Sequence, residues 1–247
     1  MTKVAPTDAD ASASQAAPVS EIAPGIFRWQ ARHPEWHTRI EWGHEVACFA
    51  LAGDQALSLV DPLLPAADSP AHLAVEQALD RLVATAARLD IMITIPYHTR
   101  SAAELYERYR ERLDVMIWGH PAVAKRFSGE ATPLTAIAPG ETVGRSAVAL
   151  PIGRPRRYET PLYFAAHRAL ACGDAIIGID GGLRVWQQAP FSPTWYDERF
   201  APTLAPLLAL DVERVLVTHG EPVLHGGRQA LRAAVAAGPW DYRSHTT

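Results

Sequence analysis

Apolar residues along this chain follow two kinds of spacing, and the spacing predicts which segments form helices and which form strands. Between Ala71 and Ala86 they recur at steps of three and four residues, the period of one face of an α-helix. Ser69 can cap the N-terminus of this helix, and Pro70 stands at its first position, where a missing N–H costs no hydrogen bond. A helix is therefore expected from about residue 70.

Short continuous apolar runs predict strands that are buried on both faces. The runs at 46–52 and 56–60 are separated by Gly53-Asp54, which predicts a hairpin, and the run at 91–95 predicts a strand after the helix. Further strands are expected around 22–29 and at 115–118, 147–150, 161–165, 169–172, 175–179 and 214–218, and further helices at 102–113, 121–127, 200–210 and 228–237.

The order of these elements predicts an α/β fold. Each half of the chain has several strands and then alternates strand and helix, which is typical of βαβ units. We expect an αββα sandwich, in which two mixed β-sheets pack face to face and helices cover the outside. Residues 21–247 form a single domain in this prediction, and residues 1–20, rich in Ala, Ser, Asp and Pro, form a disordered tail.

Composition excludes several classes of function. The chain has 247 residues, 48% of them hydrophobic, and a net charge of −4, so we expect a sizeable core and no basic surface for nucleic acid. No apolar run is long enough to span a bilayer, and the N-terminus lacks the apolar stretch of a signal peptide. Cys48 and Cys172 are expected to be buried thiols in a reducing compartment. We therefore expect a soluble cytoplasmic protein that acts on a small molecule, with no nucleic-acid partner and no membrane association.

Polar residues that could carry chemistry follow four of the predicted strands. Strand ends collect such groups in α/β folds, because the loops there leave the sheet at one edge. The four loops contain Asp61-Pro62, residues 97–101 with His98 and Arg100, Gly173-Asp174, and residues 219–222, which begin with His219.

The order of these motifs resembles the metallo-β-lactamase superfamily. A hairpin ending in Val-Asp-Pro at 60–62, a Thr-bearing strand end with a histidine loop, a later Gly-Asp and a Val-Thr-His-Gly at 217–220 follow the order of that family over residues 22–235. The resemblance implies the αββα fold and a hydrolase that holds one or two zinc ions with imidazoles and carboxylates. Such ligands suit Zn²⁺, and an open coordination position on the ion generates hydroxide.

The family's signature, Thr-His-x-His-x-Asp-His, is largely lost in this chain. Read from Thr94, Ile95 and Tyr97 stand where the first two histidines should be. Thr99 replaces the aspartate, and Arg100 replaces the last histidine. The resemblance therefore implies a degenerate metal site.

Three residues remain as potential ligands. Asp174 resembles the metal-bridging aspartate of the family, His219 resembles its last histidine, and His98 lies one residue out of register with the signature. The family's next histidine is expected within 151–159, which contains none. These ligands are too few for two ions, so the sequence leaves two alternatives for the cofactor: none, or a single Zn, Fe or Mn ion on His98, Asp174 and His219.

Arg100 suggests how the site could do without metal. A buried carboxylate without a cation is costly, and an arginine fork pairs with a carboxylate through two hydrogen bonds. We therefore predict that Arg100 pairs with Asp174 and replaces the charge of the metal.

Two further groups of residues have alternative interpretations. Arg154, Arg156 and Arg157 form a basic run that could bind an anionic substrate, although we expect a solvated loop. The histidines and tryptophans between His33 and His44 fit no ligand template, and we expect them to form a loop over the cleft.

The sequence thus supports two functions. In the first, the chain hydrolyses a small ester, thioester, lactone or phosphoester. Asp174 and His219 anchor that site, and His98 is a ligand or general base. Arg100 binds an anion or stabilises charge in the transition state. In the second, the chain is a non-catalytic binding or scaffold protein that keeps the cleft of the fold. The missing histidines favour the second function, and the retained ones favour the first.

Overall fold

The computed structural model describes residues 18–37, 43–127, 132–188 and 190–241. The predicted N-terminal tail lies almost wholly outside this range, and the first strand begins at Ser20. Within the described segments, no helix has both the length and the apolar character that crossing a membrane requires.

The first half of the chain forms a seven-stranded mixed sheet in the order β1-β2-β3-β4-β5-β6-β7. Strands β1 to β4 pair antiparallel, and β4 to β7 pair parallel. The change of direction is possible because helices carry the chain back between the parallel strands. The elements are β1 (Ser20–Ala23), β2 (Ile26–Arg32), β3 (Glu45–Ala52), β4 (Ala56–Val60), α1 (Pro70–Val83), β5 (Arg88–Ile93), η1 (Pro96–Thr99), α2 (Ala102–Tyr109), β6 (Asp114–Gly119), η2 (Pro121–Arg126) and β7 (Thr135–Ala136).

The predicted cap of α1 is confirmed. Ser69 has an extended backbone, and its hydroxyl accepts a hydrogen bond of 3.3 Å from the N–H of Ala71. Pro70 follows at the start of the helix. The buried residues of α1 are Val75, Ala78, Leu79 and Val83, so the helix packs one apolar face on the sheet.

The second half forms a five-stranded sheet, in the order β14-β11-β10-β9-β8, and a three-stranded sheet, in the order β12-β13-β15. Both sheets are mixed, since β11 pairs parallel with β14 and β13 pairs parallel with β15. The elements are β8 (Thr142–Val143), β9 (Ala147–Ala149), β10 (Leu162–Phe164), η3 (Ala165–His167), β11 (Ala169–Cys172), β12 (Ile176–Ile179), β13 (Gly182–Trp186), α3 (Pro193–Trp195), η4 (Tyr196–Phe200), η5 (Ala201–Leu204), α4 (Ala205–Ala209), β14 (Arg214–Val217), α5 (Gly227–Ala236) and β15 (Pro239–Trp240).

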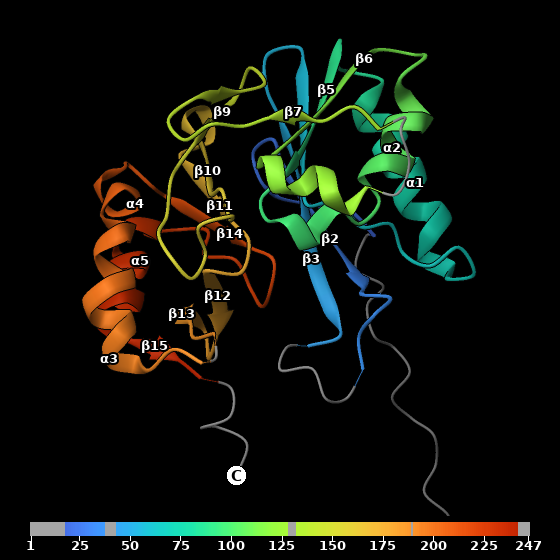
Figure 1. Cartoon of the computed structure of the whole chain (residues 1–247). Helices are drawn as coiled ribbons and strands as arrows, with labels where there is room; N and C mark the ends of the chain where they lie inside the picture. The colour runs from blue at the N-terminus through green and yellow to red at the C-terminus, as the bar shows by residue number, and fades with distance from the viewer. Residues whose placement is uncertain (1–17, 38–42, 128–131, 189, 242–247) are drawn as a thin grey trace, which may run out of the picture.

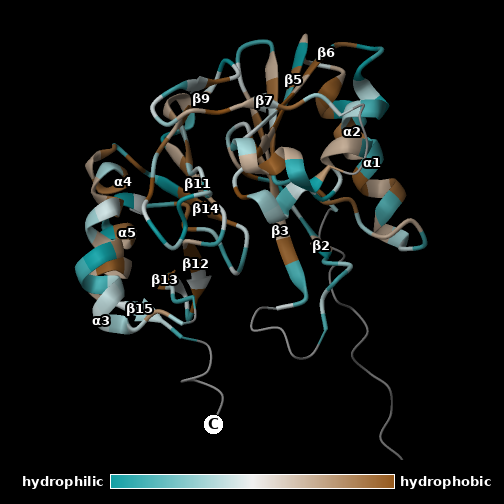
Figure 2. Ribbon diagram, in the orientation of Figure 1, coloured by the Kyte–Doolittle hydropathy of each residue, from teal (hydrophilic) through white to brown (hydrophobic). Residues whose placement is uncertain are grey.

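The predicted αββα sandwich is confirmed. Helices α1 and α2 lie on one outer side, α3, α4 and α5 lie on the other, and the strands lie between them (Figure 1). Hydrophobic colour is concentrated on the strands, whereas the outer helices alternate between hydrophobic and hydrophilic residues (Figure 2). Three apolar clusters fill the interfaces between the layers. Representative members are Leu79, Ile91 and Leu105 below α1 and α2, Phe49, Met92, Phe164 and Leu216 between the sheets, and Leu207, Val215 and Leu231 below α4 and α5.

Three local predictions need correction. The helix expected at 200–210 is broken into η5 and α4, because Pro202 and Pro206 each supply no N–H for a continuous helix. The helix expected at 102–113 ends at Tyr109. Strand β13 was not predicted. It pairs with β12 through a tight turn, in which Asp180 and Gly181 both have positive φ (51° and 75°), as such a hairpin turn requires.

Candidate functional site

The residues of the site come from loops that follow four strands. Asp61 follows β4, His98 lies in η1 after β5, Asp174 follows β11, and His219 follows β14. Strands β4 and β5 are parallel neighbours, as are β11 and β14, so each pair delivers its loops to one edge of its sheet. A backbone hydrogen bond joins these edges: the N–H of Ala47 in β3 donates to the carbonyl of Thr218 at 2.8 Å.

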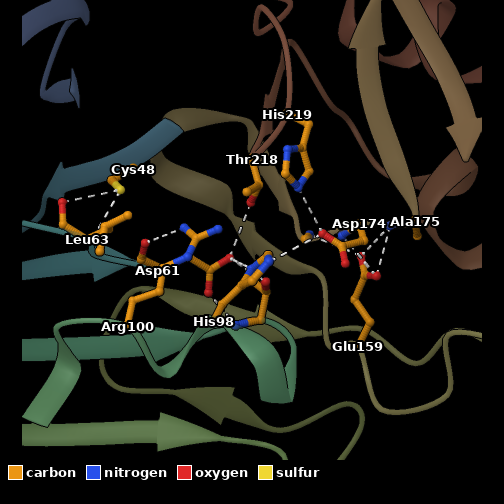
Figure 3. Close-up of polar contacts among 12 residues, drawn as sticks. Cys48, Asp61, Leu63, His98, Arg100, Glu159, Asp174, Ala175, Thr218 and His219 are labelled. Atoms are coloured by element: carbon orange, nitrogen blue, oxygen red, sulfur yellow. Dashed lines mark hydrogen bonds and ion pairs between the residues drawn. The ribbon is translucent and has the colours of Figure 1, made fainter. Parts of the chain in front are cut away.

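Asp61 is the centre of a buried hydrogen-bond network (Figure 3). The backbone N–H of Thr94 donates to Oδ1 of Asp61 at 2.8 Å, and the hydroxyl of Thr94 donates to Oδ2 at 2.5 Å. Oδ2 also lies 2.9 Å from Nδ1 of His98. Asp61 is 1% exposed and has a φ of 48°, a left-handed conformation that aspartate tolerates better than most residues. The network fixes the His98 ring, because one of its nitrogens is already engaged.

Asp174 lies between two histidines on the far side of His98 (Figure 3). Its Oδ1 is 3.3 Å from Nε2 of His98 and 3.4 Å from Nε2 of His219. One potential ligand atom from each of these three residues lies within 4.8 Å of the other two. His98 and His219 are buried, and the Asp174 side chain is 15% exposed. The arrangement matches the donor set that a single transition-metal ion takes, two imidazoles and one carboxylate.

The charges of His98 and Asp61 support each other. Burial disfavours the Asp61 carboxylate, but the neighbouring His98 outweighs it and holds the pKa of Asp61 below its ordinary value. Burial and the charge of Arg100 disfavour the imidazolium of His98, but Asp61 and Asp174 outweigh them and raise its pKa. Both pKa shifts therefore favour a charged Asp61 carboxylate paired with the His98 ring.

Asp174 is also held in its charged form. Burial opposes the carboxylate, but His98, the hydrogen bond from His219 and the charge of Arg156 together hold its pKa well below the ordinary value. Burial lowers the pKa of His219, which favours the neutral imidazole that a metal needs.

Glu159 holds the loop that carries Asp174. Its two carboxylate oxygens accept hydrogen bonds from the backbone N–H groups of Gly173, Asp174 and Ala175 at 2.9–3.1 Å. Glu159 is 2% exposed, and burial raises its pKa to about 7. The side chain therefore fixes the backbone of the Asp174 loop and not the substrate.

The predicted pairing of Arg100 with Asp174 is corrected. Nη1 of Arg100 donates to the carbonyl of Asp61 at 2.9 Å, and the guanidinium on Asp174 is that of Arg156, whose Nη1 lies 3.3 Å from Oδ2. Arg156 is 7% exposed, so the expectation of a solvated loop is wrong at this residue. The charge compensation that the sequence predicted is therefore present, but a different arginine supplies it.

The four residues predicted for the site, His98, Arg100, Asp174 and His219, do come together, since all four line one cavity of about 240 Å³. His33 and Glu35 line the same cavity, so part of the early histidine-rich segment does cover the cleft. Trp42 of that segment lies outside the described residues.

A second cavity, of about 400 Å³, shares His219 with the first. Its apolar wall consists of Ile177, Ile179, Trp186 and Trp240, and the polar side chains of Gln30, His44 and Glu45 also line it. An apolar group bound there would lie directly beside the three potential ligands.

Two glycines hold the His219 loop against β12. The N–H of Gly178 donates to the carbonyl of His219 at 2.8 Å. Gly220 has a φ of 82°, and a Cβ atom at this position would lie 1.8 Å from the carbonyl oxygen of Gly178. Only glycine permits this approach of two backbones.

Neither a protein-family model nor a curated protein matches the sequence. Solved structures do match. A β-lactamase domain protein from Burkholderia ambifaria is 20% identical with a TM-score of 0.59, and the match covers 92% of this chain and 78% of that one. DIM-1 metallo-β-lactamase is 10% identical with a TM-score of 0.62, covering 89% and 96%. A metallo-β-lactamase from Pontibacter korlensis is 10% identical with a TM-score of 0.60, covering 88% and 98%.

The chain has the metallo-β-lactamase fold.

Ile95 and Tyr97, which stand at the first two histidine positions of the signature, do not belong to the cluster of potential ligands. Ile95 is 4% exposed and belongs to the apolar core, and Tyr97 is 61% exposed and offers no imidazole. Over the part of the chain that the structure describes, His98, Asp174 and His219 form the one cluster of three or more potential metal ligands.

This cluster fits a single ion. Oδ1 of Asp174 is buried and lies 3.3 Å from Nε2 of His98 and 3.4 Å from Nε2 of His219, so the three atoms converge on one point. A cation placed there would be bound by the carboxylate and both imidazoles. His98 is further suited to bind metal, because a ligand histidine usually has its second ring nitrogen on a carboxylate or carbonyl, as His98 has on Asp61.

Proposed function

We propose that this protein is a hydrolase of the metallo-β-lactamase fold that works with one divalent metal ion held by His98, Asp174 and His219. The observation that carries the proposal is the convergence of these three side chains, with their potential ligand atoms within 4.8 Å of one another and Oδ1 of Asp174 facing both imidazoles. A bound Zn, Fe or Mn ion supplies Lewis acidity and lowers the pKa of a water molecule.

The chain's own residues prepare the site for attack on an acyl or phosphoryl group. Asp61 holds the His98 ring in one orientation, and Glu159 holds the backbone of Asp174. Arg100 lines the same cavity, and its Nε makes no hydrogen bond. Its guanidinium stabilises the negative charge that develops on the oxygen of the substrate.

The substrate in this proposal is a small ester, thioester, lactone or phosphoester. The cavity of about 400 Å³ next to His219 binds its apolar part, because Ile177, Trp186 and Trp240 form an apolar surface there. A substrate with a long charged chain on that side would have to bury its charge against these residues.

A second candidate function is supported by the cations that already surround Asp174. Arg156 and His98 both contact its carboxylate, so the site is electrostatically balanced without a metal ion. In that case the protein keeps the cleft of the fold and binds a small molecule without turnover.

Metal content separates the two functions. The protein is purified without chelators, dialysed against trace Zn, Mn and Fe, and assayed by plasma mass spectrometry. The hydrolase requires about one equivalent of metal per chain, lost in Asp174→Ala and in His219→Ala. His225→Ala is the matched control, because His225 has a side chain 88% exposed and lies outside the cluster. A folded, metal-free wild type would contradict the hydrolase and support the binding protein.

Activity provides the second test. A panel of 4-nitrophenyl esters, a thioester, a lactone and a 4-nitrophenyl phosphate diester is assayed with the metal-loaded protein. We expect turnover of at least one class, and its loss after Arg100→Gln and His98→Ala. Turnover that survives His98→Ala would show that the catalytic site lies elsewhere.

A further inference from the structure

A third cavity, of about 280 Å³, adjoins the site and shares Tyr97 with the cavity of the three ligands. It lies among η1, η2 and the loop before β10. The residues that define its chemistry are Tyr97, Lys125, Arg126, Arg156, Tyr158 and Glu159. We call this cavity the anion pocket.

The anion pocket is lined by three cationic side chains and one carboxylate. The carboxylate is that of Glu159, which is turned to the backbone N–H groups of residues 173–175. In the described segments, no ion pair involves Lys125 or Arg126, and both are exposed at the rim. The two rim cations are therefore available to a ligand in the cavity, whereas the Glu159 carboxylate is already hydrogen-bonded to backbone N–H groups.

Arg156 connects the anion pocket to the three ligands. Its Nη1 contacts Asp174 at 3.3 Å, and its side chain lines the pocket. Arg156 is 7% exposed, and its Nε makes no hydrogen bond. Arg156 therefore places one positive charge between the pocket and the Asp174 carboxylate.

An aromatic ring holds one of the two rim cations in place. The guanidinium of Arg126 lies 4.6 Å from the centre of the Tyr97 ring, which also lines the pocket. Stacking of this kind orders a long side chain before a ligand arrives, which lowers the entropic cost of binding.

From this geometry we infer that the anion pocket binds a carboxylate or phosphate group of the substrate, so that the reacting bond of an anionic small molecule lies at His98, Asp174 and His219. The inference rests on the proposed function for the reacting bond, but the binding of the anion itself does not require metal. Guanidinium and ammonium groups recognise both oxyanions through charge-assisted hydrogen bonds.

Isothermal titration calorimetry tests the inference without turnover. The probe is phenylphosphonate, which cannot be hydrolysed at an ester bond, and benzamide is the uncharged control. The protein is first freed of metal with a chelator, so that the probe cannot bind to an ion. We expect phenylphosphonate, and not benzamide, to bind the wild type.

Variants locate the binding. Lys125→Met combined with Arg126→Gln should weaken the binding of phenylphosphonate at least about tenfold, as expected when two charge-assisted contacts are lost. Arg145→Gln is the control, because Arg145 is exposed in the turn between β8 and β9 and does not line the pocket.

The outcomes for the anion pocket and for the hydrolase are distinct. Equal binding by the wild type and the Lys125/Arg126 double variant would overturn the anion pocket. Binding that depends on Lys125 and Arg126 in a protein that never takes up metal would support the anion pocket while contradicting the proposed hydrolase. A carboxylate probe, phenylacetate, then shows which oxyanion the pocket prefers.

Discussion

Nδ1 of His98 lies 2.9 Å from Oδ2 of Asp61, and this contact joins two loops that are 37 residues apart in the sequence. Because Nδ1 is engaged, Nε2 of the same ring faces Asp174 at 3.3 Å. The His98 ring is therefore anchored at one nitrogen and available at the other. The Asp61 carboxylate sets the orientation of the ring and also places a negative charge behind it, which raises the pKa of His98.

Asp61→Asn tests this relationship. The amide keeps the size of the side chain but removes the negative charge behind His98, so we expect the metal affinity to fall about 10–100-fold. Competition with a chromophoric chelator measures the affinity, and circular dichroism checks that the variant is folded. An unchanged affinity in a folded Asp61→Asn variant would show that the contact has no role in holding metal.

Glu159→Gln tests the support of the Asp174 loop. An amide places N–H donors against the backbone N–H groups of residues 173–175, so at least one buried donor loses its acceptor. We expect a loss of about 1–3 kcal/mol in the free energy of unfolding. Urea denaturation measures it, and Glu141→Gln is the control because Glu141 makes an exposed hydrogen bond of the same kind. A loss as small as that of the control would contradict the role given to Glu159.

The two cysteines are expected to be unreactive in the native protein. Cys48 is 0% exposed and Cys172 is 2% exposed. Burial raises the pKa of Cys48 to about 11 and that of Cys172 well above its ordinary value, so neither forms thiolate near neutral pH. A thiol-disulfide reagent such as Ellman's should detect no thiol in the native protein and both thiols after denaturation. Fast reaction of one thiol in the native protein would reveal local opening at that strand.

Asp80 is expected to make stability depend on acidity. It joins α1 to α2, since Arg108 donates to Oδ2 at 2.9 Å and the Tyr109 hydroxyl donates to Oδ1 at 2.9 Å. Burial opposes the charged form, but the hydrogen bonds from Arg108 and Tyr109 outweigh it and hold the pKa of Asp80 below its ordinary value.

A lowered pKa in the folded state means that the stabilisation is fully present above the ordinary aspartate pKa and is lost as the pH falls through the lower, folded-state value. Asp80→Asn should therefore be less stable than the wild type at pH 6, and the difference should shrink below about pH 4. Urea denaturation across this range measures the effect, with the exposed Asp54→Asn as the control. A difference that is constant with pH would show that the charge of Asp80 does not matter.

The sequence predicted most of the fold because the fold depends on patterns that are local. The cap at Ser69 and the apolar period after it define α1, and the continuous apolar runs define β3, β4 and β5. The prediction failed where the pattern was short, as at β13, where Leu183 and Val185 alternate with Gly182 and Arg184 over only five residues.

The three residues that converge in the structure were named from the sequence, but the residues that support them were missed. His98, Asp174 and His219 were singled out because they follow predicted strands and resemble the family's motifs, and the topology brings them together. Arg156 could not be distinguished from its neighbours in a basic run, because the path of an irregular loop decides which arginine enters the interior.

The signals for the other two supporting residues, Asp61 and Glu159, were similarly weak. Asp61 had an equally good explanation as the end of a strand before proline, and its position in the chain says nothing of its contact with His98. Nothing around Glu159 signals that the backbone of residues 173–175 will lie against it.

The close approach of Gly178 and Gly220 has a consequence for how this chain can change over time. A side chain at position 220 would collide with a backbone carbonyl, which every residue possesses, so no second substitution at 178 can make room for it. A side chain at position 178 would in turn meet the backbone of Glu221, with its Cβ 2.3 Å from the carbonyl oxygen. In a library of random variants, the folded members should therefore carry few substitutions at either position. New specificities should arise from changes in the residues that line the cavities, while the backbone of the His219 loop stays as it is.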